Sequence, residues 1–177
     1  VSHGVLAMLS SAMQSAVNEQ INNELYSSYS YLSMAAYLEH EQFRGCAKWM
    51  RMQSGEEYAH AMRLYDFLID RQCRVVLKPI TAPPVEFESI VQVFEKALEQ
   101  EQTVTQQING LWELAFNEKQ SAALVELGWF IQEQVEEEKT ATEIVHKFQM
   151  VRKDPAALLD LDRELGARQP EADGGGE

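Results

Sequence analysis

The distribution of proline constrains the fold of this chain more than any other feature of its sequence. The five prolines fall in a central cluster and near the end of the chain, at Pro79, Pro83, Pro84, Pro155 and Pro170. Proline inside a helix removes a backbone hydrogen bond and clashes with the preceding turn. The proline-free stretches, 1–78 and 85–154, are therefore the parts of the chain that can form long helices.

Four segments within these stretches are predicted to be helices. They are rich in Ala, Leu, Met, Glu, Gln and Lys, which favour helices, and their apolar residues recur every three or four positions. The segments are 5–39, 45–72, 89–117 and 120–150. The breaks between the first two and between the last two are short, so each pair is predicted to form an antiparallel hairpin.

The connector 73–88 determines how the two hairpins are joined. At roughly 3.3 Å per residue it can span about 50 Å, whereas a helix of about 28 residues is about 42 Å long. The prediction is an all-α fold, a four-helix bundle with one long crossover and a short fifth helix over 154–166 that begins at Pro155. A single domain is expected over 1–167, followed by a flexible tail at 168–177.

Composition excludes several classes of function. Hydrophobic residues make up 45% of the chain, too many for a disordered protein, and no uncharged apolar run could span a bilayer. The net charge of −13 repels the phosphates of nucleic acid. The N-terminus has no basic signal-peptide region, and Cys46 and Cys73 fit neither a disulfide framework nor a CxxC metal site. A cytoplasmic protein with reduced thiols is expected.

Each of the four predicted long helices places a carboxylate near the middle of its apolar face. These residues are Glu24, Glu57, Glu101 and Glu137. A single case could be a face assigned one residue out, as at Glu101, which has Glu99 nearby. Four buried carboxylates, however, would repel one another, and each would cost several kcal/mol. Bound cations offset that cost, and oxygen ligands with one imidazole suit iron or manganese.

The sequence Glu57-x-x-His60 is the sharpest local sign of a metal site, because a spacing of three puts both side chains on one helical face. With the motifs around it, the chain resembles the non-haem bacterial ferritins over about residues 14–150. The motifs are Glu24-Leu25-Tyr26-Ser27-Ser28 with Tyr31, Glu56-Glu57-x-x-His60, Glu101, and Glu133-Gln134-x-Glu136-Glu137-Glu138-Lys139. The resemblance implies an iron-storage ferritin subunit of a 24-subunit cage, a homo-oligomer. Such a subunit oxidises Fe²⁺ with O₂ or peroxide and stores Fe³⁺ as a ferric oxide mineral.

The resemblance also assigns the residues of the site. One iron would bind Glu24, Glu57 and His60. The second iron of the diiron centre would bind Glu57 as a bridge, Glu101 and Glu137, with Gln134 nearby. A third, inner-surface iron site would use Glu56, Glu133, Glu136 and Glu137. Tyr31 would donate an electron beside the diiron centre, and the same position also suits a core aromatic residue.

Departures from related families narrow the prediction. Bacterioferritins place a haem-binding methionine directly after the glutamate of the second helix, and here that residue is Tyr58. They also carry a histidine three positions after the glutamate at 137, where this chain has Thr140, so no haem is expected. The acidic threefold-channel residues of animal heavy-chain ferritins correspond here to Leu124 and Leu127.

Three alternatives stay open from the sequence. Related bundles perform oxygenase and ribonucleotide-reductase chemistry, although those chains are usually longer and have a substrate channel. A cage or bundle whose acids only sequester metal is the non-enzymatic alternative. The run Glu136 to Glu138 is also compatible with a solvated helix face.

Overall fold

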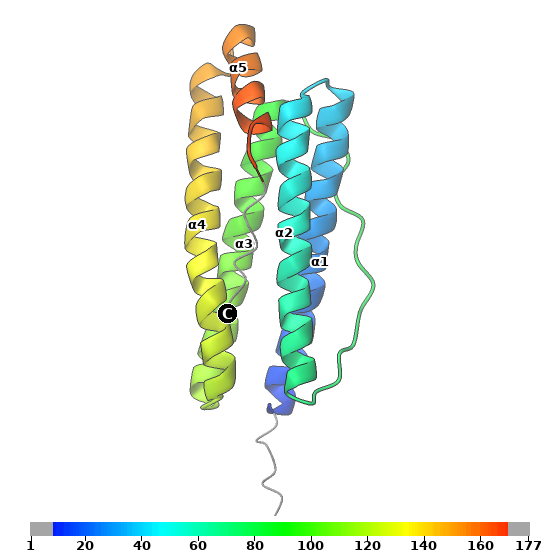
Figure 1. The fold of residues 1–177 in the computed structure, drawn as a ribbon, viewed down its shortest axis with the longest axis vertical. Coiled ribbons are helices and arrows are strands. Elements are labelled where there is room, and N and C mark those ends of the chain that lie inside the picture. Colours follow the sequence, from blue (N-terminus) through cyan, green and yellow to red (C-terminus); the bar gives the residue numbers. More distant parts are fainter. Residues whose placement is uncertain (1–8, 170–177) are drawn as a thin grey trace, which may run out of the picture.

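The computed structural model describes residues 9–169, which form five α-helices and no strand (Figure 1). The helices are α1 (Ser11–His40), α2 (Arg44–Asp70), α3 (Ile90–Asn117), α4 (Ser121–Val151) and α5 (Pro155–Gly166). The predicted all-α bundle with a long crossover and a short fifth helix is confirmed. Residues 5–8 of the first predicted helix and residues 170–177 of the predicted tail lie outside the described residues.

Side-chain caps fix where several helices begin. The Ser10 hydroxyl accepts a hydrogen bond from the Met13 backbone N–H at 3.0 Å, and α1 therefore begins at Ser11, later than predicted. Ser89 caps α3 in the same way, with the Gln92 N–H at 3.2 Å. Asp154 caps α5, whose first residue is the predicted Pro155.

Three helix ends use a left-handed residue that is not glycine. Gln42, Gln72 and Lys119 have φ angles of 66°, 57° and 55° and follow α1, α2 and α3. After each of them a backbone N–H reaches back to the helix it has just left, as where Phe43 donates to the Leu38 carbonyl at 2.9 Å. The turns at Gln42 and Lys119 make the short connections from α1 to α2 and from α3 to α4, whereas the turn at Gln72 leads into the long crossover.

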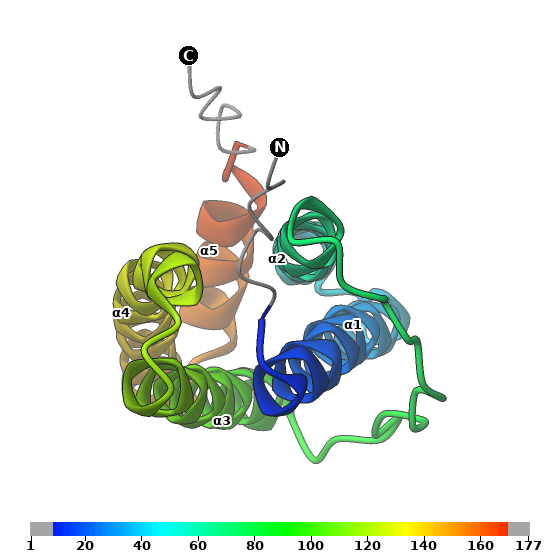
Figure 2. The ribbon, with the colours of Figure 1, turned by 90° about the horizontal axis from the view of Figure 1, so that it is seen from below.

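Viewed along its axis, the bundle has four sides that are not equally packed (Figure 2). Helix α1 packs on α2, α3 packs on α4, and α1 packs on α3. On the fourth side, between α2 and α4, the short helix α5 lies between the ends of the two helices and contacts both of them. Side chains rather than close helix packing therefore bridge α2 and α4 along the rest of that side.

The crossover 71–89 runs the length of the bundle on the outside of α1 (Figure 1). Polar side chains of α1 hold its backbone at both ends. The Asn18 amide donates to the Arg74 carbonyl at 3.1 Å and accepts from the Val76 N–H at 2.7 Å. The Tyr37 hydroxyl donates to the Phe87 carbonyl at 3.0 Å.

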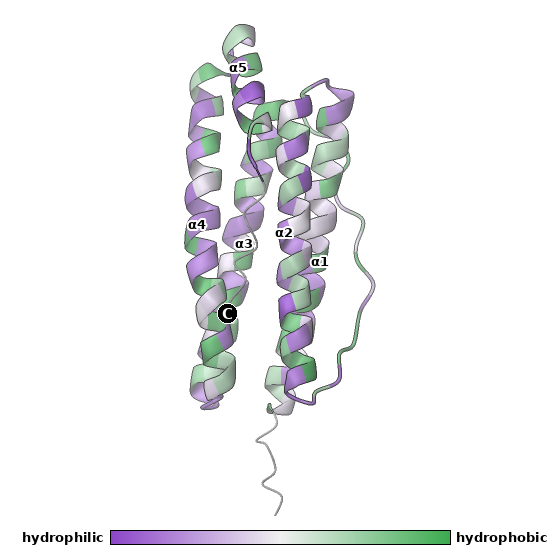
Figure 3. Cartoon of the chain, in the orientation of Figure 1, coloured by the Kyte–Doolittle hydropathy of each residue, from purple (hydrophilic) through white to green (hydrophobic). Residues whose placement is uncertain are grey.

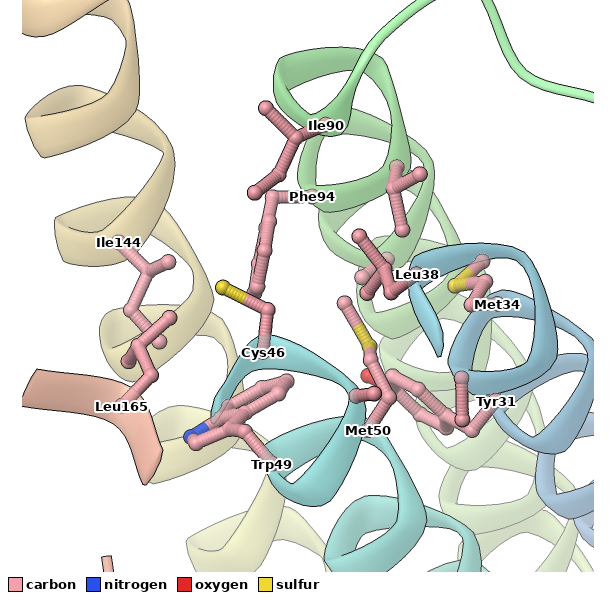
Figure 4. Close-up of a cluster of buried hydrophobic side chains, with 14 of the residues drawn as sticks. Tyr31, Met34, Leu38, Cys46, Trp49, Met50, Ile90, Phe94, Ile144 and Leu165 are labelled. Atoms are coloured by element: carbon pink, nitrogen blue, oxygen red, sulfur yellow. The ribbon is translucent and has the colours of Figure 1, made fainter. Parts of the chain in front are cut away.

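The four long helices carry hydrophilic and hydrophobic residues along their whole length (Figure 3), as expected of helices that bury one face. Their apolar side chains form two separate clusters. One lies near α5, where Cys46 and Trp49 of α2 meet Phe94 of α3, Ile144 of α4 and Leu165 of α5 (Figure 4). The other, built around residues such as Met13, Leu64, Ile108 and Phe130, lies toward the opposite end.

A layer of buried polar side chains separates the two clusters. It includes residues from all four long helices: Gln20, Glu24, Gln53, Glu57, His60, Glu101, Gln134 and Glu137. No helix in the described part of the chain is long and apolar enough to cross a membrane.

Candidate metal centre

The polar layer contains every residue predicted for the two iron positions of a diiron centre. The six side chains are between 0% and 9% exposed: Glu24, Glu57, His60, Glu101, Gln134 and Glu137. Helical periodicity predicts that the four glutamates point into the bundle, and in the folded chain all four are buried. Tyr31, at 0% exposed, lies beside them at the edge of the α5-side cluster.

Glu24, Glu57 and His60 form the tightest group. One ligand atom from each lies within 4.8 Å of the others. The Nδ1 atom of His60 is 3.6 Å from Oε2 of Glu57, too far for a hydrogen bond. A single cation between them could contact all three side chains, as predicted for the first iron position.

The oxygens of this group lack the donors that buried carboxylates normally have. Oε1 of Glu24 accepts a hydrogen bond from Nε2 of Gln20 at 2.8 Å. When both groups are ionised, Oε2 of Glu24 and both oxygens of Glu57 have no hydrogen-bond donor. A proton shared between Glu24 and Glu57 would supply one of these interactions. Native proteins rarely leave such atoms unsatisfied, because each costs about 1–3 kcal/mol or more when charged. A bound cation would supply the missing interactions, so the donor set fits a metal.

Glu101 and Glu137 each have hydrogen-bond donors of their own. The Tyr31 hydroxyl donates a short hydrogen bond to Glu101, and Nε2 of Gln134 donates to Oε2 of Glu101 at 3.3 Å. Nε2 of Gln53 donates to Oε2 of Glu137 at 3.0 Å. Within the described chain, Glu57, Glu101 and Glu137 do not form a second group as tight as the first.

Burial raises the pKa of every one of these carboxyls, and repulsion between neighbouring carboxylates adds to the rise at Glu57, Glu101 and Glu137. The pKa of Glu57 lies well above its usual value because of burial, and then because of the charges of Glu101 and Glu24. Burial raises the pKa of Glu101 to about 7 and that of Glu137 to about 8. The pKa of Glu24 is also raised, again chiefly by burial. Burial therefore favours the protonated form of all four carboxyls, and a cation that binds them displaces protons.

His60 is in the form that binds metals. Burial, together with the charge of the nearby Arg63 guanidinium, lowers its pKa to about 4. Arg63 in turn lies over the Trp129 ring, 4.2 Å from the ring centre, and the Trp129 ring meets His60 edge-on. The imidazole is neutral at physiological pH, and neutral imidazole is the metal ligand.

The predicted third-site carboxylates lie at the side of this centre. Oε1 of Glu133 is 4.0 Å from Nε2 of His60. The charges of Glu56 and Glu133 both raise the pKa of Glu137, which places the three carboxylates near one another. Glu136 is exposed. A second Glu-x-x-His sequence, from Glu143 to His146, is exposed on α4.

Three contributors were missed at the sequence level. Gln20 and Gln53 stand four residues before Glu24 and Glu57, and their amides donate to Glu24 and Glu137. That shared spacing was the available signal, because residues four apart lie on one helical face. Arg168 lies beyond α5 and contacts Gln53 and Glu56. It is more than 110 residues from both in the sequence, so no local spacing connects it to them.

Known proteins provide an independent comparison. Residues 14–151 match the family model of the ferritin-like domain. The chain is 40% identical over 161 residues to a bacterial non-heme ferritin of Staphylococcus epidermidis, covering 91% of this chain and 97% of that protein. It is 35% identical, with the same coverage, to a bacterial non-heme ferritin of Staphylococcus aureus.

Solved structures agree in fold as well as in sequence. An open-pore ferritin from the hyperthermophilic archaeon Archaeoglobus fulgidus superposes with a TM-score of 0.90 and 45% identity, covering 91% of this chain and 98% of that one. The predicted resemblance to the non-haem bacterial ferritins is confirmed. On the strength of the bundle, the buried carboxylates and these relatives, the chain belongs to the ferritin family.

Proposed function

We propose that this ferritin subunit oxidises Fe²⁺ with O₂ inside its own helix bundle and stores the product as a ferric oxide mineral in a multi-subunit cage. The observation that carries the proposal is the group of Glu24, Glu57 and His60. When Glu24 and Glu57 are ionised, three of their buried carboxylate oxygens have no hydrogen-bond donor. Buried carboxylate oxygens of this kind can bind a cation, and without one their burial costs free energy.

The residues divide into two iron positions. Glu24 and His60 would hold the first Fe²⁺, Glu101 and Glu137 the second, and Glu57 would bridge them. Four carboxylates match the charge of two Fe²⁺ ions and favour the change to Fe³⁺, because added negative charge stabilises the higher oxidation state. Gln134, which already donates to Glu101, would orient that ligand.

The reaction balances as two one-electron oxidations. Two Fe²⁺ ions become two Fe³⁺ ions, and one O₂ takes up the two electrons with two protons to give H₂O₂. The raised pKa values of Glu101 and Glu137 mean that metal binding displaces protons from these carboxyls. The Tyr31 hydroxyl donates a short hydrogen bond to Glu101, which supports the predicted role of Tyr31 as an electron donor beside the diiron centre.

Product iron would leave toward the side where the additional acidic residues lie. Glu56, Glu133 and Glu137 would form a third iron site, with Glu136 at its exposed margin. The proposal includes the predicted 24-subunit homo-oligomeric cage in the cytoplasm, with Fe²⁺ and O₂ or peroxide as the small-molecule partners and no haem.

The direct test is oxidation of Fe²⁺ by metal-free protein in air. Ferric absorbance and O₂ consumption should rise quickly and saturate with Fe²⁺ concentration. In Glu57→Ala, the rate should fall more than tenfold, because the bridging ligand is lost. Glu143→Ala is the matched control, since it removes the glutamate of the exposed Glu-x-x-His sequence. An unchanged rate in Glu57→Ala contradicts the proposal, and a rate that never saturates points to passive sequestration.

A further inference from the structure

Beyond α5 the chain folds back onto α2, where Arg168 meets the acidic side of the centre. Its Nη2 atom donates to both oxygens of Glu56, at 2.9 and 3.0 Å. Its Nη1 atom donates a short hydrogen bond to Oε1 of Gln53, and the guanidinium lies 5.3 Å from the Trp49 ring centre. Arg168 and Glu56 are only 22% and 26% exposed, so this is a partly buried ion pair.

The contact of Arg168 extends to a residue of the metal centre. Gln53 is 1% exposed, and while its oxygen accepts from Arg168, its Nε2 donates to Oε2 of Glu137 at 3.0 Å. The path runs from Arg168 through α2 to α4, across the side of the bundle where those helices do not pack closely. Arg168 thus contacts one acid of the third site directly and another through a single amide.

The backbone that carries Arg168 is fixed in place. Gly45 of α2 and Gly166 of α5 touch so closely that a Cβ on Gly166 would lie 2.8 Å from the Gly45 Cα. The Asp162 carboxylate accepts from the Cys46 N–H at 2.8 Å. The Lys48 ammonium donates to the carbonyls of Gly166 at 2.9 Å and Arg168 at 3.3 Å. These contacts distinguish Arg168 from an arginine on a free surface.

We propose that Arg168 is a tethered cation that competes with metal for the third iron site. Its guanidinium pairs with the Glu56 carboxylate. Through Gln53 it also holds Glu137 in position at the two buried iron positions. This inference rests on the proposed function, because it assumes that the carboxylates at the centre bind iron. In the native chain, a metal ion at the third site must displace a permanent positive charge before it can use Glu56.

Removing Arg168 should therefore open the third site. In Arg168→Ala the Glu56 carboxylate loses its charged partner, so the affinity of the third site for a cation should increase roughly tenfold. Arg168→Lys keeps a point charge but loses the two-pronged contact with Glu56. It should therefore fall between the native chain and Arg168→Ala.

The experiment uses the full, metal-free chain and two probes. First, two equivalents of Zn²⁺ per subunit are added to fill the two buried iron positions, and calorimetry monitors this binding. Tb³⁺, a hard cation that prefers oxygen ligands, is then titrated while its luminescence is excited through tryptophan, because Trp49 lies under Arg168. The expected result is that Tb³⁺ binds Arg168→Ala roughly tenfold more tightly than it binds the native chain.

Arg163→Ala is the matched control. It removes one arginine from α5 that is 73% exposed and pairs with Asp160. Equal Tb³⁺ affinity in the native chain and Arg168→Ala would overturn the inference. So would an equal gain in Arg163→Ala, because the effect would then be one of overall charge. Failure of the native chain to bind two Zn²⁺ would instead count against the proposed function.

Discussion

At the scale of single residues, the buried carboxyls of this subunit are arranged for a bound cation rather than for the metal-free state. Glu57 is 1% exposed and lies next to Glu24 and His60, and when it is ionised neither of its oxygens has a hydrogen-bond donor. Without a cation, folding must bury this group at a cost. The residues that make the site useful are therefore a source of instability in the empty subunit.

The substitution Glu57→Gln should separate these two effects. It should stabilise the metal-free protein by about 1–3 kcal/mol, because a neutral amide replaces a buried acid and can donate to the unpartnered oxygen of Glu24. It should also weaken Zn²⁺ binding, because one ligand charge is lost. Thermal unfolding with chelator present and calorimetry with Zn²⁺ measure the two effects. A lower melting temperature than that of the native chain would contradict the account, and Glu143→Gln should change neither quantity.

Sequence reasoning reached most of the site at this scale, and its failures have a physical cause. A charged residue on a predicted apolar helical face stands out in the sequence, and this feature identified Glu24, Glu57, Glu101 and Glu137. Gln53 is uncharged and therefore does not stand out on such a face. Arg168 depends on how a segment beyond the last helix folds back across the molecule, which helical periodicity does not describe.

At the scale of elements, the position of α5 depends on its contact with α2. Gly45 has no conformational reason to be glycine, since it lies within a helix, but its Cα is in contact with α5. The hairpins, the crossover and most helix boundaries were predictable from proline, capping residues and connector length, whereas α1 begins at Ser11 rather than at residue 5. The side of the bundle to which α5 returns was not, because it is set by this close backbone approach.

We expect Gly45→Ala to displace α5. The added Cβ would lie 1.8 Å from the Asp162 carbonyl oxygen, so the backbone must shift, at a cost of about 1–3 kcal/mol. Gly55→Ala is the control on the same helix, because its Cβ would meet nothing within 4 Å and should add up to about 1 kcal/mol of helix stability. Urea unfolding of both variants compares them. Equal stabilities would show that α5 is not held by this contact.

At the scale of the whole molecule, the core is divided by a titratable layer, so stability should depend on pH in a definite direction. The pKa of Glu101 is raised to about 7 and that of Glu137 to about 8, chiefly by burial. Each such carboxyl contributes its full stability below its ordinary pKa of 4.5, and this contribution is lost progressively as the pH rises from there through its pKa in the folded chain. His60, whose pKa is lowered to about 4 by burial, adds no pH dependence above its ordinary value of 6.5.

The metal-free protein should therefore lose stability between about pH 6.5 and about pH 8, by at most about 1.4 kcal/mol per pH unit for each carboxyl. Zn²⁺-loaded protein should show the opposite slope, because metal and protons compete for the same oxygens. Melting temperatures across this range, with chelator and with Zn²⁺, test the prediction. Parallel slopes in the two series would refute it.

The unequal packing of the four sides has a mechanical consequence. Helix contacts link α2 to α1, α1 to α3 and α3 to α4, whereas α2 and α4 are joined mainly by side chains and by α5. The collective motion that breaks the fewest contacts is therefore the separation of α2 from α4. Ligands on both helices would restrain that motion when metal is bound, so the occupancy of the centre would set the stiffness of the whole bundle.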